Sequence, residues 1–125
     1  MPASKVLLSY NLDKHSLRRL DKLAASLSIR LKPVLSSQYG LPLGVLCGIS
    51  GIPIQKKPVQ AEILTKPMLV FSGLDADTLD LFLEQYQKAA LPPVARKAIL
   101  TPDNVFWDSC ALYEELSKEH RAMNL

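Results

Sequence analysis

The chain has 125 residues, of which 48% are hydrophobic, and carries a formal net charge of +3. This size and apolar content are those of one ordinary domain with a real core. The two cysteines, Cys47 and Cys110, belong to no Cys-x-x-Cys pair or His cluster. Neither a disulfide framework nor a zinc site is therefore indicated.

The apolar segments indicate neither a signal peptide nor a membrane span. The first residues lead into a short apolar run without the charged region, long apolar core and cleavage site of a signal peptide. The apolar stretch over residues 41–54 is interrupted by glycine and proline and is too short to cross a bilayer. We expect a soluble, cytoplasmic protein with no membrane partner.

Charge is divided unevenly along the chain. Residues 1–66 hold ten Lys or Arg against three Asp or Glu, a net +7, whereas residues 67–125 hold five against nine, a net −4. Such asymmetry can mark nucleic-acid binding, or it can let two halves or two copies attract each other. An RNA-binding sheet needs several exposed aromatics, and an acidic half repels phosphate. We expect a homo-oligomer or a protein partner rather than nucleic acid.

The first predicted strand begins at Val6, in an apolar run consistent with burial on both faces. Asp13 is placed to cap the helix that follows. A second strand is predicted over Ile29–Leu35, and Pro33, which has no N–H to donate, places it at a sheet edge or a bulge. A short helix is predicted over Leu41–Ile49.

The same order of elements is predicted again in the second half. The residues from Val6, VLLSYNLD, align with those from Met68, MLVFSGLD, so that the chain contains the same unit twice. Asp75 is placed to cap the second helix. A strand over Val94–Leu100 follows, whose mixed polarity suggests an edge, and then a long helix from Val105 to about Ala122.

We therefore predict one domain, residues 1–125, made of two βαβα repeats at 5–49 and 67–123. A loop at 50–66, with glycine, proline and lysine, joins them. The predicted fold class is α/β, with one four-stranded, mainly parallel sheet covered by helices and the Val6 and Met68 strands in its centre. The alternative is a ferredoxin-like α+β sandwich, which also places these two strands in the middle.

A parallel sheet predicts a crevice beyond the carboxyl ends of its central strands. This crevice would bring Tyr10 and Asn11 together with Ser72 and Gly73, beside two helix N-termini whose free amides could hold an anion. The capping aspartates would compete with such a ligand. The alternative is that these are polar turns in which Gly73 supplies a tight bend. Neither turn has the glycine-rich pattern of a nucleotide loop.

A second candidate site surrounds the only tryptophan. Thr101 or Asn104 can cap the last helix. Trp107 falls nearly opposite the apolar face of that helix, as in a partner surface or pocket wall, or else it folds over the preceding turn. We predict that it is partly exposed. Lys97 is either a buried lysine with an activated amine or a solvated lysine whose charge prevents an edge strand from pairing with another chain.

The run Pro67–Gly73 and the motif Lys97-Ala-Ile-Leu-Thr101, followed by Asn104 and Trp107, resemble a family known only as a domain of unknown function. The first half also looks like the amino-terminal part of longer members of this family. The resemblance implies no activity, substrate or cofactor. It does group Lys97, Thr101, Asn104 and Trp107 as residues to test together.

Taken together, these patterns favour a non-catalytic module that binds a small ligand or a protein partner. We expect no catalytic residues, metal or cofactor, because His15 and His120 lie on predicted helices without a nearby nucleophile. The alternative is an enzyme acting on a small molecule in the crevice at the ends of the central strands. The candidate binding residues are Tyr10, Asn11, Ser72, Gly73, Lys97, Thr101, Asn104 and Trp107. Opposite charges on the first and second long helices favour pairing between chains.

Overall fold

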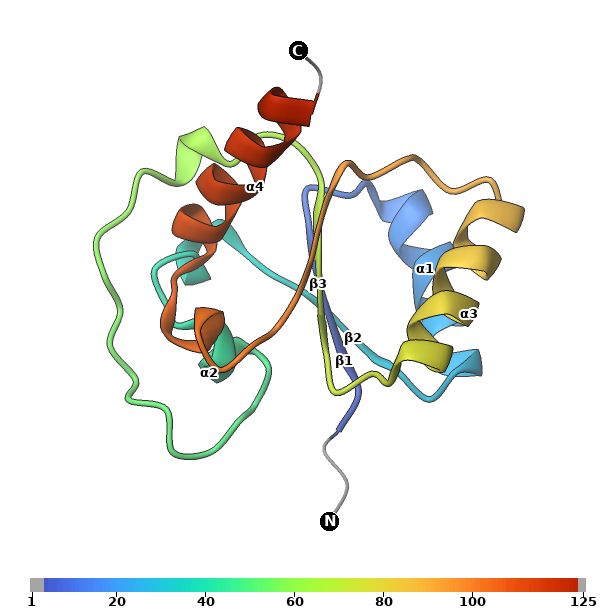
Figure 1. The fold of residues 1–125 in the computed structure, drawn as a ribbon, viewed down its shortest axis with the longest axis horizontal. Coiled ribbons are helices and arrows are strands. Elements are labelled where there is room, and N and C mark those ends of the chain that lie inside the picture. The colour runs from blue at the N-terminus through green and yellow to red at the C-terminus, as the bar shows by residue number, and fades with distance from the viewer. Residues whose placement is uncertain (1–3, 124–125) are drawn as a thin grey trace.

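The computed structural model describes residues 4–123, which form three layers with a sheet between two pairs of helices (Figure 1). The strands are β1 (Val6–Tyr10), β2 (Arg30–Pro33), β3 (Met68–Ser72) and β4 (Arg96–Ile99). Two helices, α1 (Lys14–Ser26) and α3 (Ala76–Lys88), cover one face of the sheet. The other face is covered by α2 (Leu43–Leu46) and α4 (Ser109–Met123).

The strand order is β2-β1-β3-β4. The outer pairs, β1 with β2 and β3 with β4, are parallel, whereas β1 and β3 run antiparallel. The predicted mixed α/β class, the mainly parallel sheet and the central position of β1 and β3 are therefore confirmed. The prediction that the two central strands run parallel is wrong, and so is the ferredoxin-like alternative, in which outer strands pair antiparallel. The duplication of the unit stays a prediction.

The central strands are buried on both faces, which explains their continuous apolar sequences. Alternate side chains point to opposite layers. Leu8 and Val70 belong to the core under α2 and α4, whereas Leu7 and Leu69 belong to the core under α1 and α3. The sheet thus separates two apolar cores.

Local signals correctly located the starts of α1 and α3 and the sheet edges, whereas α4, predicted from Val105, begins at Ser109. The carboxylate of Asp13 accepts a hydrogen bond from the Ser16 N–H at 2.7 Å, and that of Asp75 accepts one from the Thr78 N–H at 2.7 Å. Both aspartates are therefore N-caps, as predicted. β2, which contains Pro33, and β4 are the two edge strands.

The segment at 50–66 is tied to the rest of the chain. The Lys57 N–H donates to the Gly40 carbonyl at 2.9 Å, and a Cβ at Gly40 would lie 2.0 Å from the Lys57 oxygen, so only glycine allows this approach. The Asn11 side chain donates to the Leu64 carbonyl at 2.7 Å, just after a 3-10 turn over Ala61–Ile63. No helix in the described part of the chain is long and apolar enough to cross a membrane.

Candidate functional site

The crevice predicted between the central strands does not form. Val6 is opposite Ser72 and Tyr10 is opposite Met68, because β1 and β3 run antiparallel. Tyr10 and Asn11 therefore lie at one end of the sheet and Ser72 and Gly73 at the other. The two turns cannot line a common site, and the proposed position for an enzyme active site is lost with them.

Tyr10 and Ser72 are enclosed in the protein. Tyr10 is fully buried, and its hydroxyl shares a hydrogen bond of 2.7 Å with the Ser109 hydroxyl on α4. Burial strongly raises the pKa of Tyr10, which keeps the phenol neutral. Ser72 is also buried and interacts with Cys47. These contacts join the sheet to the helices above it, and neither side chain reaches solvent.

Asn11 and Gly73 shape the two strand-to-helix turns. Their φ angles are +60° and +78°, in the left-handed region that Asn and Gly tolerate best. A Cβ at Gly73 would lie 2.5 Å from the Ser4 carbonyl oxygen, so this bend also requires glycine. The interpretation of these residues as turn formers accounts for both.

Thr101 and Asn104 do not cap α4 but bond to each other at the turn that leads into a short 3-10 turn, η3 (Asn104–Phe106). The Thr101 N–H donates to the Asn104 side-chain oxygen at 2.7 Å, and the Asn104 N–H donates to the Thr101 hydroxyl at 3.0 Å. The Asn104 amide group donates to the Ile99 carbonyl at 3.1 Å. α4 begins later, where the Asp108 carboxylate accepts from the Ala111 N–H at 2.8 Å.

Lys97 and Trp107 reach the surface, but in different hollows. Trp107 is 37% exposed and Phe106 is 56% exposed, so the predicted partial exposure of the tryptophan is confirmed. The reason differs from the prediction, because Trp107 precedes α4 instead of lying on its polar face. The two aromatics line a hollow of about 460 Å³ that also includes the charged residues Lys57, Asp108, Glu114, Glu115 and Lys118.

Lys97 lies in a groove that sequence reasoning missed, between α3 and the edge strand β4. One part of the groove is a hollow of about 590 Å³, lined by Leu69, Phe82, Leu83, Tyr86, Gln87, Leu91, Pro93, Val94, Ala95 and Lys97. The other part is a hollow of about 420 Å³, lined by Phe71, Leu79, Leu83, Lys97, Ala98, Ile99 and Thr101. Both parts share Leu83 and Lys97. Lys97 is the only charged side chain in either lining.

The groove is open because the helix layer is displaced toward the opposite edge of the sheet. α1 packs on β2, whereas α3 makes few contacts with β4. Ile99 on β4 is consequently 52% exposed. No sequence signal marked this groove, because Leu79 and Leu83, which line it, also pack on the core as one apolar helix face predicts.

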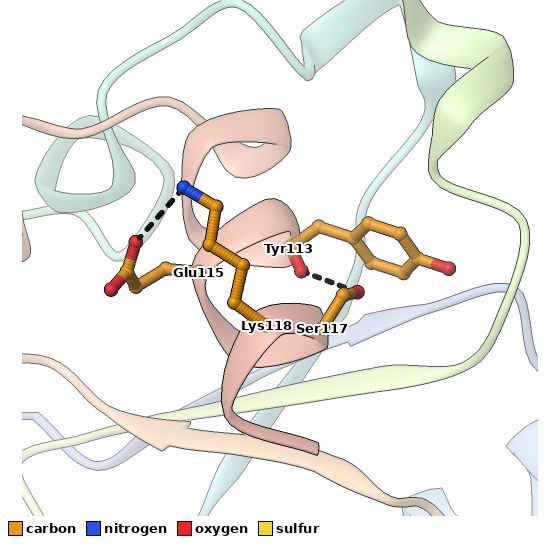
Figure 2. A network of polar contacts seen from close by, with 4 residues as sticks. All are labelled: Tyr113, Glu115, Ser117 and Lys118. Carbon is orange, nitrogen blue, oxygen red and sulfur yellow. Dashed lines mark hydrogen bonds and ion pairs between the residues drawn. The ribbon is translucent and has the colours of Figure 1, made fainter. Parts of the chain in front are cut away.

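The opposite face of β4, toward α4, carries a further hollow of about 370 Å³, lined by Ile63, Arg96, Tyr113, Glu114, Ser117 and Lys118. The Arg96 guanidinium donates to the Ser117 hydroxyl at 2.9 Å and lies 4.9 Å from the ring centre of Tyr113. The Ser117 hydroxyl in turn donates to the Tyr113 carbonyl at 2.7 Å within α4 (Figure 2). A neighbouring ion pair of 4.0 Å joins Glu115 and Lys118 on the same helix (Figure 2). The α4 side of β4 therefore presents a hollow with several charged and polar side chains, whereas the α3 side presents mainly apolar ones.

The groove is lined mainly by apolar side chains. The polar side chains in its lining are Lys97, Gln87, Tyr86 and Thr101, and the Tyr86 hydroxyl already donates to the Pro92 carbonyl. The two cysteines lie elsewhere, and burial raises the pKa of both thiols. Among residues 4–123, no cluster of His, Cys, Asp and Glu is placed to hold a metal ion.

The fold and groove define a three-layer α/β protein with an open apolar channel along one sheet edge. Residues 67–123 match the family model of a domain of unknown function, DUF3783. This match contains β3, α3, β4 and α4, and hence the entire groove. This match confirms an uncharacterised domain in the second half, whereas the motif from Lys97 to Trp107 and the resemblance of the first half stay predictions. No curated protein and no solved structure matches the chain.

Proposed function

We propose that this chain is a non-catalytic binding module that receives an extended peptide segment of a partner protein along β4. The observation that carries the proposal is the alignment of two apolar hollows beside an exposed strand edge. Peptides that add a strand to a sheet edge gain affinity from main-chain hydrogen bonds and specificity from pockets for alternate side chains. The groove offers both kinds of contact.

The backbone of β4 has groups available for an added strand. The Leu100 N–H donates to the Phe71 carbonyl at 2.8 Å, which fixes the parallel ladder with β3. Residues alternate along a parallel strand, so the backbone groups of Lys97 and Ile99 point away from β3. The Ile99 carbonyl already accepts from Asn104. The Lys97 N–H and C=O are therefore the main attachment point for a peptide.

The side chains that line the groove determine which peptide sequence it would bind. Every second residue of an extended peptide lies on the same face, about 6.6 Å from the next, so apolar side chains at positions i and i+4 can enter the two hollows. Lys97 lies where the hollows meet. An acidic side chain at position i+2, on the same face, would complement this lysine. We therefore expect the partner segment to be extended, with an acidic residue flanked by apolar residues two positions before and two positions after it.

The test uses fluorescein-labelled peptides of this pattern and measures binding to the full chain by fluorescence anisotropy. Lys97→Glu should weaken binding of the acidic peptide. It should strengthen binding of a peptide in which lysine replaces the acidic residue. Arg30→Glu, on the opposite edge strand, is the control with the same change of charge and should not alter binding. Leu83→Asp should reduce binding of both peptides, with circular dichroism used to verify folding.

Methylation of the peptide backbone separates strand addition from simple hydrophobic contact. N-methylation of the amide facing Lys97 should abolish binding, whereas methylation of the amide on the other side should not. Equal affinity of the patterned and scrambled peptides would contradict the proposal. If octanoate bound in a Lys97-dependent way and no peptide did, the site would instead be one for small apolar acids.

A further inference from the structure

α1 and α3 form a paired outer layer on one face of the molecule (Figure 1). Both helices have 13 residues and both begin after an aspartate cap. The Arg19 guanidinium is half-buried and donates to the Ala89 carbonyl at the end of α3. The two helices are thus held together as one surface.

Equivalent positions on this surface carry opposite charges. Arg18 and Lys22 are the fifth and ninth residues after the cap of α1, and Asp80 and Glu84 occupy the same positions in α3. All four side chains are exposed. α1 contains four Lys or Arg against one Asp, a net +3, and α3 contains one Lys against three acidic residues, a net −2. The layer therefore has a positive half and a negative half.

These charges are not matched across the two helices within the chain. Among the described residues, Glu84 pairs with Lys88 inside α3 at 3.0 Å, and the other ion pair lies on α4. No ion pair joins α1 to α3 in this part of the chain. The opposite charges on the layer are consequently available to another molecule.

A surface with one positive and one negative half is complementary to its own copy. Rotation about a two-fold axis along the helices places α1 of one copy over α3 of the other, and both contacts are then attractive. We propose that a second copy of this chain docks on the α1 and α3 layer in this way. Leu81, 41% exposed on α3, is covered in the complex and packs on the aliphatic stems of the opposing basic side chains.

Charge reversal tests this arrangement by sedimentation velocity at low salt. The first variant, Arg18→Glu with Lys22→Glu, makes the layer acidic throughout, and the second, Asp80→Lys with Glu84→Lys, makes it basic throughout. Each variant alone should be monomeric, because both contacts become repulsive. An equimolar mixture should restore a dimer, since each contact then joins opposite charges. The four substitutions combined in one chain should also restore it.

Lys56→Glu with Lys57→Glu is the control, because it changes the net charge by the same amount away from this layer and should leave the dimer intact. Raising the salt concentration from about 50 to about 500 mM should weaken association by about tenfold or more. Circular dichroism establishes that each variant is folded. A monomeric unmodified chain at low salt, dimers of either variant alone, or no dimer in the mixture would each overturn the proposal.

Discussion

Asn104 is the residue of the Lys97 to Trp107 motif whose role the structure makes clearest. It makes three hydrogen bonds that connect the end of β4 to η3, and it is buried. Leaving buried polar groups without partners costs more than the net value of each bond. Asn104→Ala should therefore lower the free energy of unfolding by about 2–3 kcal/mol, measured by urea denaturation.

Thr101→Val is the matched control for this prediction, because it removes only the hydroxyl that accepts from the Asn104 N–H. This substitution should lower the free energy of unfolding by about 1 kcal/mol. If Asn104→Ala left stability unchanged and abolished peptide binding, Asn104 would be a binding residue instead. The spacing Thr-x-x-Asn is equally suited to a cap and to a site, and the sequence alone could not distinguish them.

At the scale of elements, the aspartate caps give a prediction about pH. Hydrogen bonds from Ser16 lower the pKa of Asp13, and those from Thr78 lower the pKa of Asp75. A carboxyl whose pKa is lower in the folded state stabilises the fold above its unfolded pKa, and this contribution is lost as pH falls through the folded pKa. The melting temperature should therefore decline below about pH 4.

Asp13→Asn combined with Asp75→Asn should reduce this decline, because asparagine caps a helix without titrating. The melting temperature would be measured by circular dichroism between about pH 2 and pH 7. Asp21→Asn, which removes an exposed carboxylate that caps no helix, is the control. An unchanged pH profile in the double variant would show that the acid sensitivity arises elsewhere.

The features of the elements that were predicted correctly are those that depend on residues close together in the sequence. The burial of β1 and β3, the two caps and the edge position of Pro33 follow from residue types and short-range spacing. The direction of β3 does not, since the segment at 50–66 is long enough to return the chain to either end of the sheet. The candidate crevice failed for this reason, and the groove was missed because it depends on how α3 lies relative to β4.

At the scale of the whole molecule, the register of the central pair relates the two halves. In the alignment of Val6 with Met68, Leu8 corresponds to Val70, and these two residues face each other at the middle of the antiparallel pair. The flanking pairs, Val6 with Ser72 and Tyr10 with Met68, are arranged symmetrically around them. β1 and β3 thus present equivalent edges to each other, as two copies of one unit would.

This relation predicts how the matched segment alone should behave. A fragment of residues 64–125 retains α3 and α4 but lacks β1, so the pairing at one edge of β3 and the part of each apolar core supplied by the first half would be lost. We expect no folded monomer. The fragment should instead form a dimer in which β3 pairs with β3 of a second copy, with Val70 opposite Val70. Size-exclusion chromatography with light scattering would measure its mass.

Cysteine cross-linking fixes the register of that dimer. In a Cys110→Ser background, Val70→Cys should form a disulfide between two fragments, because cross-strand partners lie close enough for a bond. Leu69→Cys is the control, since in this register residue 69 faces residue 71 of the other copy and should cross-link poorly. In the full chain, β1 occupies the edge of β3, so Val70→Cys should not link two chains. A stable, monomeric fragment would show that the second half does not need the first to complete its sheet.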